Sequence, residues 1–298
     1  MSGGVGGAKL ARGLHDVLAP GELTVIGNVG DDVEVLGLHV SPDLDSVLYA
    51  LAGLNDEERG WGRAGETWNA LESARAWGGE EWFMLGDLDI GLHLVRTRSL
   101  RAGEPLSAVT ARLAEAAGLG TRLVPVTDDR LRTHLVTPAG TFPFQEWFVA
   151  RGHRDEVDGL VYEGAGDAGP APGVLDTLAA ADAIVVAPSN PYVSIHPILA
   201  VPGVREALES RTARCVAVSP LIGGRAVKGP LDRMLRHMAG GTTPAHVARC
   251  YSGLIDALVI DGADAPAEAD APIVVTDTLM SDRDAARRLA QTTLEAAS

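Results

Sequence analysis

Short runs of valine, isoleucine and alanine that do not alternate with polar residues constrain the fold of this chain more than any other feature. They occur at residues 23–26, 183–187, 215–218, 257–260 and 273–276. Strands without alternation are typical of parallel sheets that helices cover on both faces. Polar or glycine-rich segments come directly after three of these runs, at residues 188–191, 219–224 and 276–279. Because ligands bind beyond the carboxyl ends of such strands, we predict that these segments form the walls of one site.

The segments between these runs predict a Rossmann-like α/β fold, a mostly parallel sheet with helices on both faces and an inserted helical and hairpin subdomain. Apolar residues at helical spacing predict helices at residues 9–19, 174–181, 204–210, 230–238, 245–254 and 282–297. Residues 55–162 show a different sequence pattern, which predicts helices at 66–77 and 106–117 and a hairpin over 134–149. We predict a nucleotide-binding core, residues 1–54 and 163–298, and an inserted subdomain, residues 55–162.

A glycine-rich segment and a cluster of carboxylates together indicate an anionic ligand with a metal ion. The sequence SGGVGGAK spans residues 2–9, and four aspartates lie further along in one short stretch, at 31, 32, 43 and 45. Glycines let backbone N–H groups approach an anion, and a helix that starts there adds its positive dipole end. Carboxylates reach phosphate through Mg²⁺, which accepts one or two of them plus phosphate oxygens. The alternative is purely structural, with Asp31 and Asp32 as helix caps and a turn at residues 42–45.

Familiar nucleotide-binding and hydrolase motifs are absent. A dinucleotide fingerprint read from Gly4 has Lys9 in place of its third glycine, and no acidic residue stands at the ribose position near residues 27–28. A Walker A loop needs lysine directly after glycine, but Ala8 separates Gly7 from Lys9. No G-x-S-x-G elbow or HExxH segment occurs. The sequence therefore argues against an NAD oxidoreductase and a P-loop NTPase.

Charge and cysteine content narrow the class of partner. The formal net charge of −15, from 25 basic and 40 acidic residues, argues against nucleic acid or an anionic membrane as the main partner. Cys215 and Cys250 are far apart and form no CxxC pair, which fits a reducing compartment. With no secretory leader or membrane span apparent, we expect a cytoplasmic protein.

The glycine-rich segment has little chain in front of it. A β-strand normally leads into such a loop, but only Met1 and Ser2 are available here. The expectation is therefore either a true start further upstream or a sheet that lacks a central strand. The second option would cost most of that strand's ladder hydrogen bonds.

An ordered set of motifs resembles the 2-phospho-L-lactate transferase family of coenzyme F420 biosynthesis. The motifs are GGVGGAK, NVGDD, SPDLD, GWG (60–62), LGDLD (85–89) with HLVR (93–96), FQEWFV (144–149), PSNPYVSI (188–195) with PILAVPGVR, SPLIGG and TDTLM. The match runs nearly end to end and looks most like the actinobacterial members, the phosphoenolpyruvate transferases. The resemblance implies a Mg²⁺-dependent phosphotransferase for substituted phosphate groups, of the EC 2.7.8 type, that forms a homodimer.

The resemblance also implies the substrates. The donor would be enolpyruvyl- or lactyl-2-diphospho-5′-guanosine, and the acceptor would be the deazaflavin Fo. The terminal ribityl hydroxyl of Fo would attack the phosphorus that bears the acid, and GMP would leave. The product would be dehydro F420-0 or F420-0. The inserted subdomain would contribute to the acceptor pocket, and the sequence alone leaves open whether the acid is enolpyruvate or lactate.

The motifs also supply the candidate site residues. For the donor's diphosphate and guanosine we expect Gly3, Gly4, Gly6, Gly7, Lys9, Ser189, Asn190, Gly223 and Gly224. For the acceptor we expect Asp45, Met84, Asp87 and His93, and for the metal Asp45 with Asp32 and Asp31. Asp45 is the expected catalytic residue, and the sequence does not separate a metal ligand from a general base at this position.

Two positions depart from the family's usual pattern. The residue after LGD is usually basic, and the one before it is often polar or basic, but here they are Leu88 and Met84. Less positive charge beside an anionic donor would weaken catalysis or change donor preference. The alternative function is a non-catalytic regulator that binds a nucleotide or nucleotide sugar, as in the related gluconeogenesis-factor family. The SPDLD, GWG and FQEWFV segments favour the transferase, since a regulator has no use for an aromatic acceptor pocket.

Overall fold

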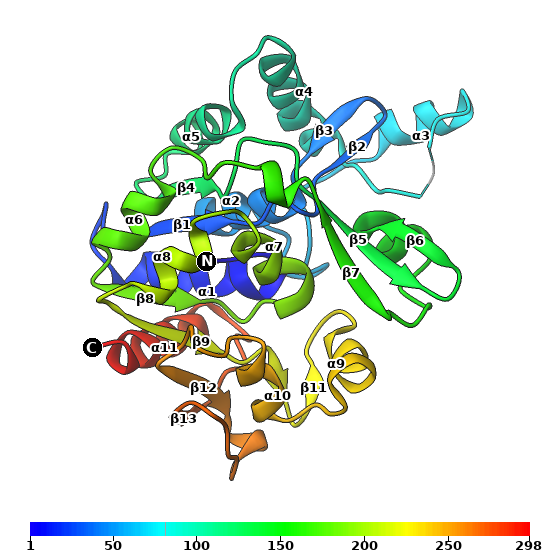
Figure 1. The fold of residues 1–298 in the computed structure, drawn as a ribbon. Helices are drawn as coiled ribbons and strands as arrows, with labels where there is room; N and C mark the ends of the chain where they lie inside the picture. Colours follow the sequence, from blue (N-terminus) through cyan, green and yellow to red (C-terminus); the bar gives the residue numbers. More distant parts are fainter. Residues whose placement is uncertain (81) are drawn as a thin grey trace.

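Parallel strands form the centre of the fold, as their apolar sequences predict. The computed structural model describes residues 1–80 and 82–298. Four parallel strands lie in the order β13-β12-β9-β8 (Figure 1). Their bounds are β8 (Ala183–Val186), β9 (Arg214–Val218), β12 (Ala257–Asp261) and β13 (Ile273–Thr276). The four runs predicted as parallel strands are thus confirmed, with bounds that shift by at most one residue. The expectation that all four are buried on both faces is wrong for β13, an edge strand whose Val275 is 52% exposed.

Met1 and Ser2 connect these four strands to a second parallel pair, β1 (Thr24–Gly27) and β4 (Arg122–Pro125). The Ser2 N–H donates to the carbonyl of Ile26 at 3.0 Å, and the Met1 amino group donates to the carbonyl of Val185 at 2.8 Å. The amino terminus therefore lies between β1 and β8 (Figure 1). The place of the central strand is not empty, contrary to one of the two expectations, because two residues occupy it and bond to both neighbours.

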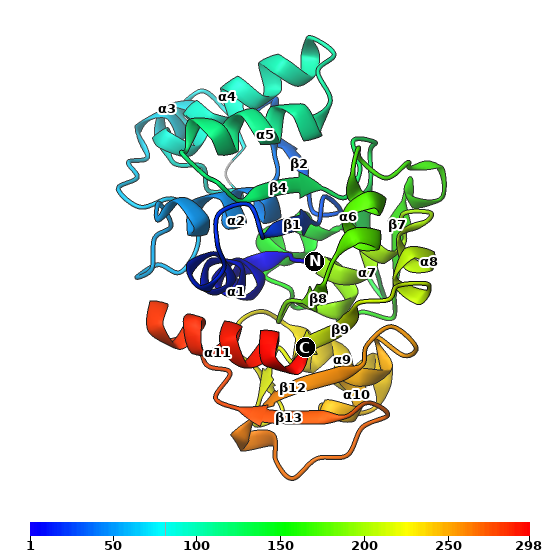
Figure 2. The same ribbon diagram turned by 90° about the vertical axis from the view of Figure 1, so that its left-hand side faces the viewer.

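Helices cover both faces of this sheet (Figure 2). On one side lie α1 (Gly4–Val17) and α11 (Arg283–Ala296), and on the other α6 (Val174–Ala180), α8 (Val204–Glu209) and α10 (Pro244–Arg249). The arrangement confirms the predicted Rossmann-like class. Among the described residues, no helix is both long and apolar enough to cross a bilayer.

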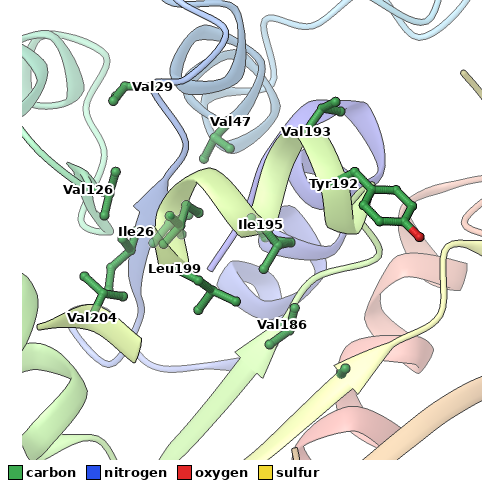
Figure 3. Packing of buried hydrophobic residues seen from close by; sticks show 14 of the residues in the cluster. Ile26, Val29, Val47, Val126, Val186, Tyr192, Val193, Ile195, Leu199 and Val204 are labelled. Carbon is green, nitrogen blue, oxygen red and sulfur yellow. The ribbon is translucent and has the colours of Figure 1, made fainter. Parts of the chain in front are cut away.

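The segment after β8 is held in place by the core. A π-helical turn, η3 (Pro191–Ile195), runs into α7 (His196–Leu199). Ile195 and Leu199 are buried and pack among Ile26 and Val186 (Figure 3). Removing side chains as buried as these usually costs about 2–5 kcal/mol of stability. The core thereby fixes the PSNP segment that begins at the carboxyl end of β8.

Helix α1 begins earlier than predicted, at Gly4 instead of residue 9, so the glycine-rich segment is the first turn of the helix. A Cβ on Gly6 would lie 2.5 Å from the carbonyl oxygen of Pro188, and one on Gly3 would lie 2.6 Å from a carboxylate oxygen of Asp43. These glycines therefore allow close packing of α1 on its neighbours. A Cβ on Gly4 would meet no atom within 4 Å, and its φ of +65° favours glycine.

The range 55–162 mixes added elements with a strand of the central sheet. It contains α3 (Asn69–Ala76), α4 (Asp87–Arg101), α5 (Leu106–Ala116), β4, β5 (Arg132–Thr137), β6 (Gly140–Pro143), the π-helical turn η1 (Glu146–Ala150) and β7 (Gly159–Glu163). The expected hairpin is present, but its second strand ends at residue 143, ahead of η1. Because β4 pairs with β1, the central sheet takes a strand from inside this range, and the division at residues 55 and 162 stays a prediction.

The remaining elements surround the loops of the sheet. They are the hairpin of β2 (Val33–Val35) and β3 (Leu38–Val40), helix α2 (Pro42–Ala52), the small hairpin of β10 (Leu221–Ile222) and β11 (Arg225–Ala226), α9 (Leu231–Ala239) and the 3₁₀ turns η2 (Ala165–Asp167) and η4 (Gly262–Asp264). The turn considered for residues 42–45 is the first turn of α2, with Pro42 at its start.

Candidate functional site

A cavity of about 660 Å³ lies at the carboxyl ends of the parallel strands. Loops after β1, β8, β9 and β13 contribute Asp31, Asn190, Ser219 and Thr278 to its wall. This is the edge where open α/β sheets bind ligands. The volume falls within the usual range of about 300–1,000 Å³ for small-molecule sites.

Two groups of residues on the cavity wall differ in chemistry. One comprises the first turn of α1 and Lys9, whose Nζ donates to the carbonyl of Met280 at 2.8 Å. The other comprises aromatic side chains from the range 55–162, namely Trp61, Phe83, Phe144 and Phe148. The rings of Phe144 and Phe148 stack with centroids 5.3 Å apart. One group thus offers N–H groups and a cation, and the other offers surfaces for a flat ring.

Asp43 joins the start of α1 to the start of α2. One of its oxygens accepts from the Gly4 N–H at 2.7 Å, and the other accepts from the Asn28 side-chain amide at 2.8 Å. Asn28 also donates to the carbonyl of Val193 in η3. The carboxylate therefore occupies the positive end of the α1 dipole and holds the loops after β1 and β8 together.

Asp31 and Asp43 form a pair of buried carboxylates on the cavity wall. Burial raises the pKa of Asp31 well above its usual value, and the neighbouring Asp43 and Asp32 raise it further. Burial likewise raises the pKa of Asp43 to about 6, although bonds from Asn28 and Gly4 oppose this. The Asp31 Oδ1 atom is buried without a hydrogen-bond partner in the described structure.

These observations fit a bound divalent cation. A cation beside Asp31 and Asp43 would relieve their repulsion and give the unpartnered oxygen a ligand. Within residues 1–80 and 82–298, no three His, Cys, Asp or Glu side chains form a complete protein metal site. Mg²⁺ does not need one, because it commonly takes one or two carboxylates and completes its shell with phosphate oxygens and water.

Asp45 lines the cavity but already has a partner. Both of its oxygens accept hydrogen bonds from the guanidinium of Arg96, which is fully buried. His93 Nδ1 lies 3.8 Å from the nearer Asp45 oxygen, and burial lowers the pKa of His93 to about 4, so its ring is neutral at pH 7. Because the buried Arg96 already neutralises the Asp45 carboxylate, the ion pair argues against Asp45 as a metal ligand or general base. Both roles stay predictions that the geometry does not favour.

The structure brings together more than half of the predicted site residues. Those on the cavity wall are Gly3, Gly4, Gly6, Lys9, Asp31, Asp45, Met84, His93 and Asn190. Those that are not on it are Gly7, Asp32, Asp87, Ser189, Gly223 and Gly224. In the second group, the polar groups make hydrogen bonds to other parts of the protein, or the backbone packs closely against neighbouring residues.

Gly223 and Gly224 illustrate the difference. Their N–H groups, expected to hold donor phosphates, donate to the two carboxylate oxygens of Asp264 at 3.1 and 2.7 Å. The Ser189 hydroxyl is buried and donates to the carbonyl of Gly3 at 2.7 Å. Groups that are already paired inside the protein are poor candidates for ligand contacts.

Two predicted aspartates have structural partners as well. The same oxygen of Asp32 accepts from the Ser41 hydroxyl at 3.0 Å and lies 2.9 Å from a His39 ring nitrogen. Asp87 is partly exposed and accepts hydrogen bonds from Thr67 and from the first residues of α3, which lower its pKa to about 2. The structure therefore places Asp32 behind the cavity wall and Asp87 at a helix start.

Asp89 is an acidic residue of the cavity wall that the sequence reasoning missed. It lines the cavity and accepts the Tyr49 hydroxyl hydrogen bond at 2.6 Å, and burial raises its pKa to about 6. A signal for it exists in the sequence, because Asp89, His93 and Arg96 are spaced by four and three residues. That spacing places three polar side chains on one face of a helix.

Asp89 predicts a measurable pH dependence of stability. Its pKa rises from 3.8 to about 6 on folding, so the folded state keeps a proton that the unfolded state has released. The free energy of unfolding should therefore fall as the pH rises from about 4 through 6, by on the order of 2–3 kcal/mol from this group. In Asp89→Asn this contribution is absent, so the variant gains stability relative to wild type over that window. Denaturant unfolding of wild type and Asp89→Asn at pH 4.5, 5.5 and 7 measures this difference. If the free energies of unfolding of the two proteins change with pH in the same way, the prediction is contradicted.

Comparison with known proteins gives a consistent result along the whole chain. The family model for 2-phospho-L-lactate transferase CofD matches residues 1–295. A phosphoenolpyruvate transferase of Streptomyces griseus is 44% identical over 308 residues, covering 100% of this chain and 97% of the relative. One of Streptomyces coelicolor is 43% identical, covering 99% and 96%. One of a Mycobacterium species is 40% identical, covering 95% and 93%.

A solved structure shares the fold. The crystal structure of a UPF0052 family member from Bacillus halodurans superposes with a TM-score of 0.62 at 18% identity, covering 98% of this chain and 96% of that one. At this level of identity the similarity supports the α/β architecture alone, so it does not favour the alternative of a non-catalytic regulator.

Proposed function

The chain belongs to the 2-phospho-L-lactate transferase family, and from this membership we propose that it transfers a phosphoenolpyruvyl group to the deazaflavin Fo in coenzyme F420 biosynthesis. The observation that carries the proposal is the similarity to phosphoenolpyruvate transferases along the full chain. The activity for which these relatives are named favours enolpyruvyl-2-diphospho-5′-guanosine over the lactyl donor. GMP and dehydro F420-0 would be the products.

The aromatic and the cationic groups of the cavity wall support this assignment. The stacked Phe144 and Phe148 with Trp61 offer apolar faces for the deazaflavin ring, and the start of α1 with Lys9 offers N–H groups and a cation for the diphosphate. The ribityl chain of Fo would then extend towards the diphosphate. In this orientation its terminal hydroxyl would lie near the phosphorus that bears the acid.

The reaction is an in-line displacement at phosphorus. The hydroxyl oxygen of Fo forms a bond to the phosphorus bearing the enolpyruvyl group, the bond from that phosphorus to the bridging oxygen breaks, and GMP leaves. Phosphoryl transfer of this kind depends on positioning and charge neutralisation more than on covalent catalysis. Asp89, on the cavity wall with a pKa of about 6, is suited to accept the hydroxyl proton.

A divalent cation fits the buried carboxylate pair of the cavity wall. Asp31 and Asp43 would hold Mg²⁺, which when bound would offset charge on the diphosphate. Asp43 also fixes the Gly4 N–H and the loop after β1, so its carboxylate orients the start of α1. The expected homodimer stays a prediction.

The test is a turnover assay with Fo, enolpyruvyl-2-diphospho-5′-guanosine and Mg²⁺ that monitors GMP release and the mass of the deazaflavin product. We expect stoichiometric GMP and a deazaflavin heavier by one phosphoenolpyruvyl group. The lactyl donor, tested in parallel, measures donor preference. Absence of product with both donors, together with no quenching of Fo fluorescence by the protein, would overturn the proposal.

A further inference from the structure

The two lysines of the chain both line the cavity. The sequence has 25 basic residues, of which only two are lysines, Lys9 and Lys228. Both lysines line the cavity, and no arginine is among the described residues of its wall. Lys9 belongs to the predicted diphosphate site. Lys228 has no role in the mechanism so far.

Lys228 lies on a short strap, defined here as residues 227–230, that connects β11 to α9. All four strap residues contribute to the cavity wall. The strap leads directly into α9. Arg233 on this helix donates from its guanidinium to the carbonyls of His153 and Arg154 at 2.8 and 3.0 Å. The position of Lys228 therefore depends on a helix that is bonded to the neighbouring η1 region.

The ammonium group of Lys228 has no carboxylate partner in the described part of the chain. Its Nζ donates at 3.0 Å to the carbonyl oxygen of Gly60 in the GWG loop, which also lines the cavity. A Cβ on Gly60 would overlap this ammonium group, so glycine leaves room for the contact. A neutral carbonyl satisfies one N–H but does not neutralise the charge, and the remaining two N–H groups stay available.

The charges on the cavity wall leave a need for such a cation. Four carboxylates line the cavity, those of Asp31, Asp43, Asp45 and Asp89, and only Asp45 is neutralised by a buried arginine. A donor with a diphosphate and a carboxylate would bring more negative charge into this wall. Mg²⁺ held by Asp31 and Asp43 would offset part of this charge. Apart from Lys228, Lys9 is the other Lys or Arg side chain among the described residues of the wall, and the position after LGD, which is usually basic in the family, is Leu88.

We propose that Lys228 binds an anionic oxygen of the donor, from its diphosphate or from the carboxylate of the three-carbon acid. In the free protein the Gly60 carbonyl holds the ammonium group at the cavity wall. On binding, the anion takes up the free N–H groups. The identity of the donor rests on the proposed function, whereas binding of an anion by Lys228 does not.

The two-lysine composition makes a direct test possible. Selective ¹³C-lysine labelling of the full chain gives Cε–Hε NMR signals from Lys9 and Lys228 alone and leaves both ammonium groups unmodified, and the Lys228→Arg variant assigns the two signals. GDP with Mg²⁺ is the first probe, and the enolpyruvyl donor is the second. A shift of the Lys228 signal with GDP identifies phosphate as the partner, and a shift with the donor alone identifies the carboxylate. A Lys228 signal that neither saturating probe moves would overturn the proposal.

Variants add a kinetic readout. Lys228→Met keeps the apolar stem and removes the charge, and we expect it to raise the KM for the donor at least tenfold, with Lys228→Arg recovering most of the loss. Arg225→Met, on the exposed neighbouring strand, is the matched control and should leave KM unchanged. Equal KM values for wild type and Lys228→Met would contradict the proposal. If the wild type shows no turnover, the proposed function fails. The NMR shifts would still test anion binding by Lys228, because they do not depend on turnover.

Discussion

Replacing Arg96 by methionine is expected to lower the free energy of unfolding by about 3–5 kcal/mol, the range for breaking a buried ion pair. Arg96 is fully buried on α4 and donates to both oxygens of Asp45 on α2. Although burial alone would lower the pKa of Arg96, the Asp45 carboxylate raises it, so the guanidinium stays charged. Methionine fills similar space but leaves the Asp45 carboxylate buried without its partner. Urea unfolding at pH 7 measures the loss.

The double variant Arg96→Met with Asp45→Leu is the control. Removing both charges avoids the unpaired carboxylate, so the double variant should recover a large part of the stability lost in Arg96→Met. If Arg96→Met and wild type unfold at the same urea concentration, the ion pair does not stabilise the fold. The result also decides how Asp45→Asn is interpreted, because an inactive variant that is also destabilised does not establish a catalytic role.

The central sheet was predictable because its signal is local and strong. Unalternating apolar runs are typical of parallel strands, and residues 273–276 were predicted with the bounds that the structure shows, although this edge strand is only partly buried. The polar segments after these runs also reach the cavity, since parallel strands end at one edge. Strand chemistry and topology therefore made both the sheet and this edge of the site predictable from the sequence.

Helix α4 shows why the range 55–162 was harder to interpret. Its buried face carries Asp89, His93 and Arg96, whereas Leu94 and Val95 are 55% and 48% exposed. This is the reverse of the apolar stripe by which a helix is recognised. A polar face is buried here because it serves the cavity and the Asp45 ion pair, so the signal for the helix was lost where function overrides the usual pattern.

The glycines show a second limit. The pattern GGVGG predicted N–H groups free for an anion, but a sequence does not tell whether a missing side chain makes room for a ligand or for the protein itself. Gly6 makes room for Pro188, and the N–H groups of Gly223 and Gly224 bond to Asp264, about 40 residues further along the chain. Only the packing of distant segments separates these cases.

Replacing Asp31 by asparagine is expected to reduce Mg²⁺-dependent turnover on the order of 100-fold or more without loss of stability. Asp31 is buried with an unpartnered oxygen, and burial together with Asp43 raises its pKa, so the charged carboxylate is costly in the folded protein in the absence of a cation. Asparagine carries no charge and removes the repulsion with Asp43, so the free energy of unfolding should stay equal or rise. What the variant loses is a ligand for the cation that offsets charge in the transition state.

Asp32→Asn provides the matched control, because Asp32 is equally buried and adjacent but does not line the cavity. Its carboxylate bonds to Ser41 and His39, so this variant should lose stability but keep its response to Mg²⁺. We would measure turnover against Mg²⁺ concentration after EDTA treatment, and the rise in melting temperature on adding GDP with Mg²⁺. Opposite effects in the two variants would locate the cation at Asp31. If Asp31→Asn kept the wild-type Mg²⁺ dependence, or if EDTA left wild-type turnover unchanged, the carboxylate pair would not be a metal site, and the raised pKa of Asp31 would reflect a proton held in the cavity wall.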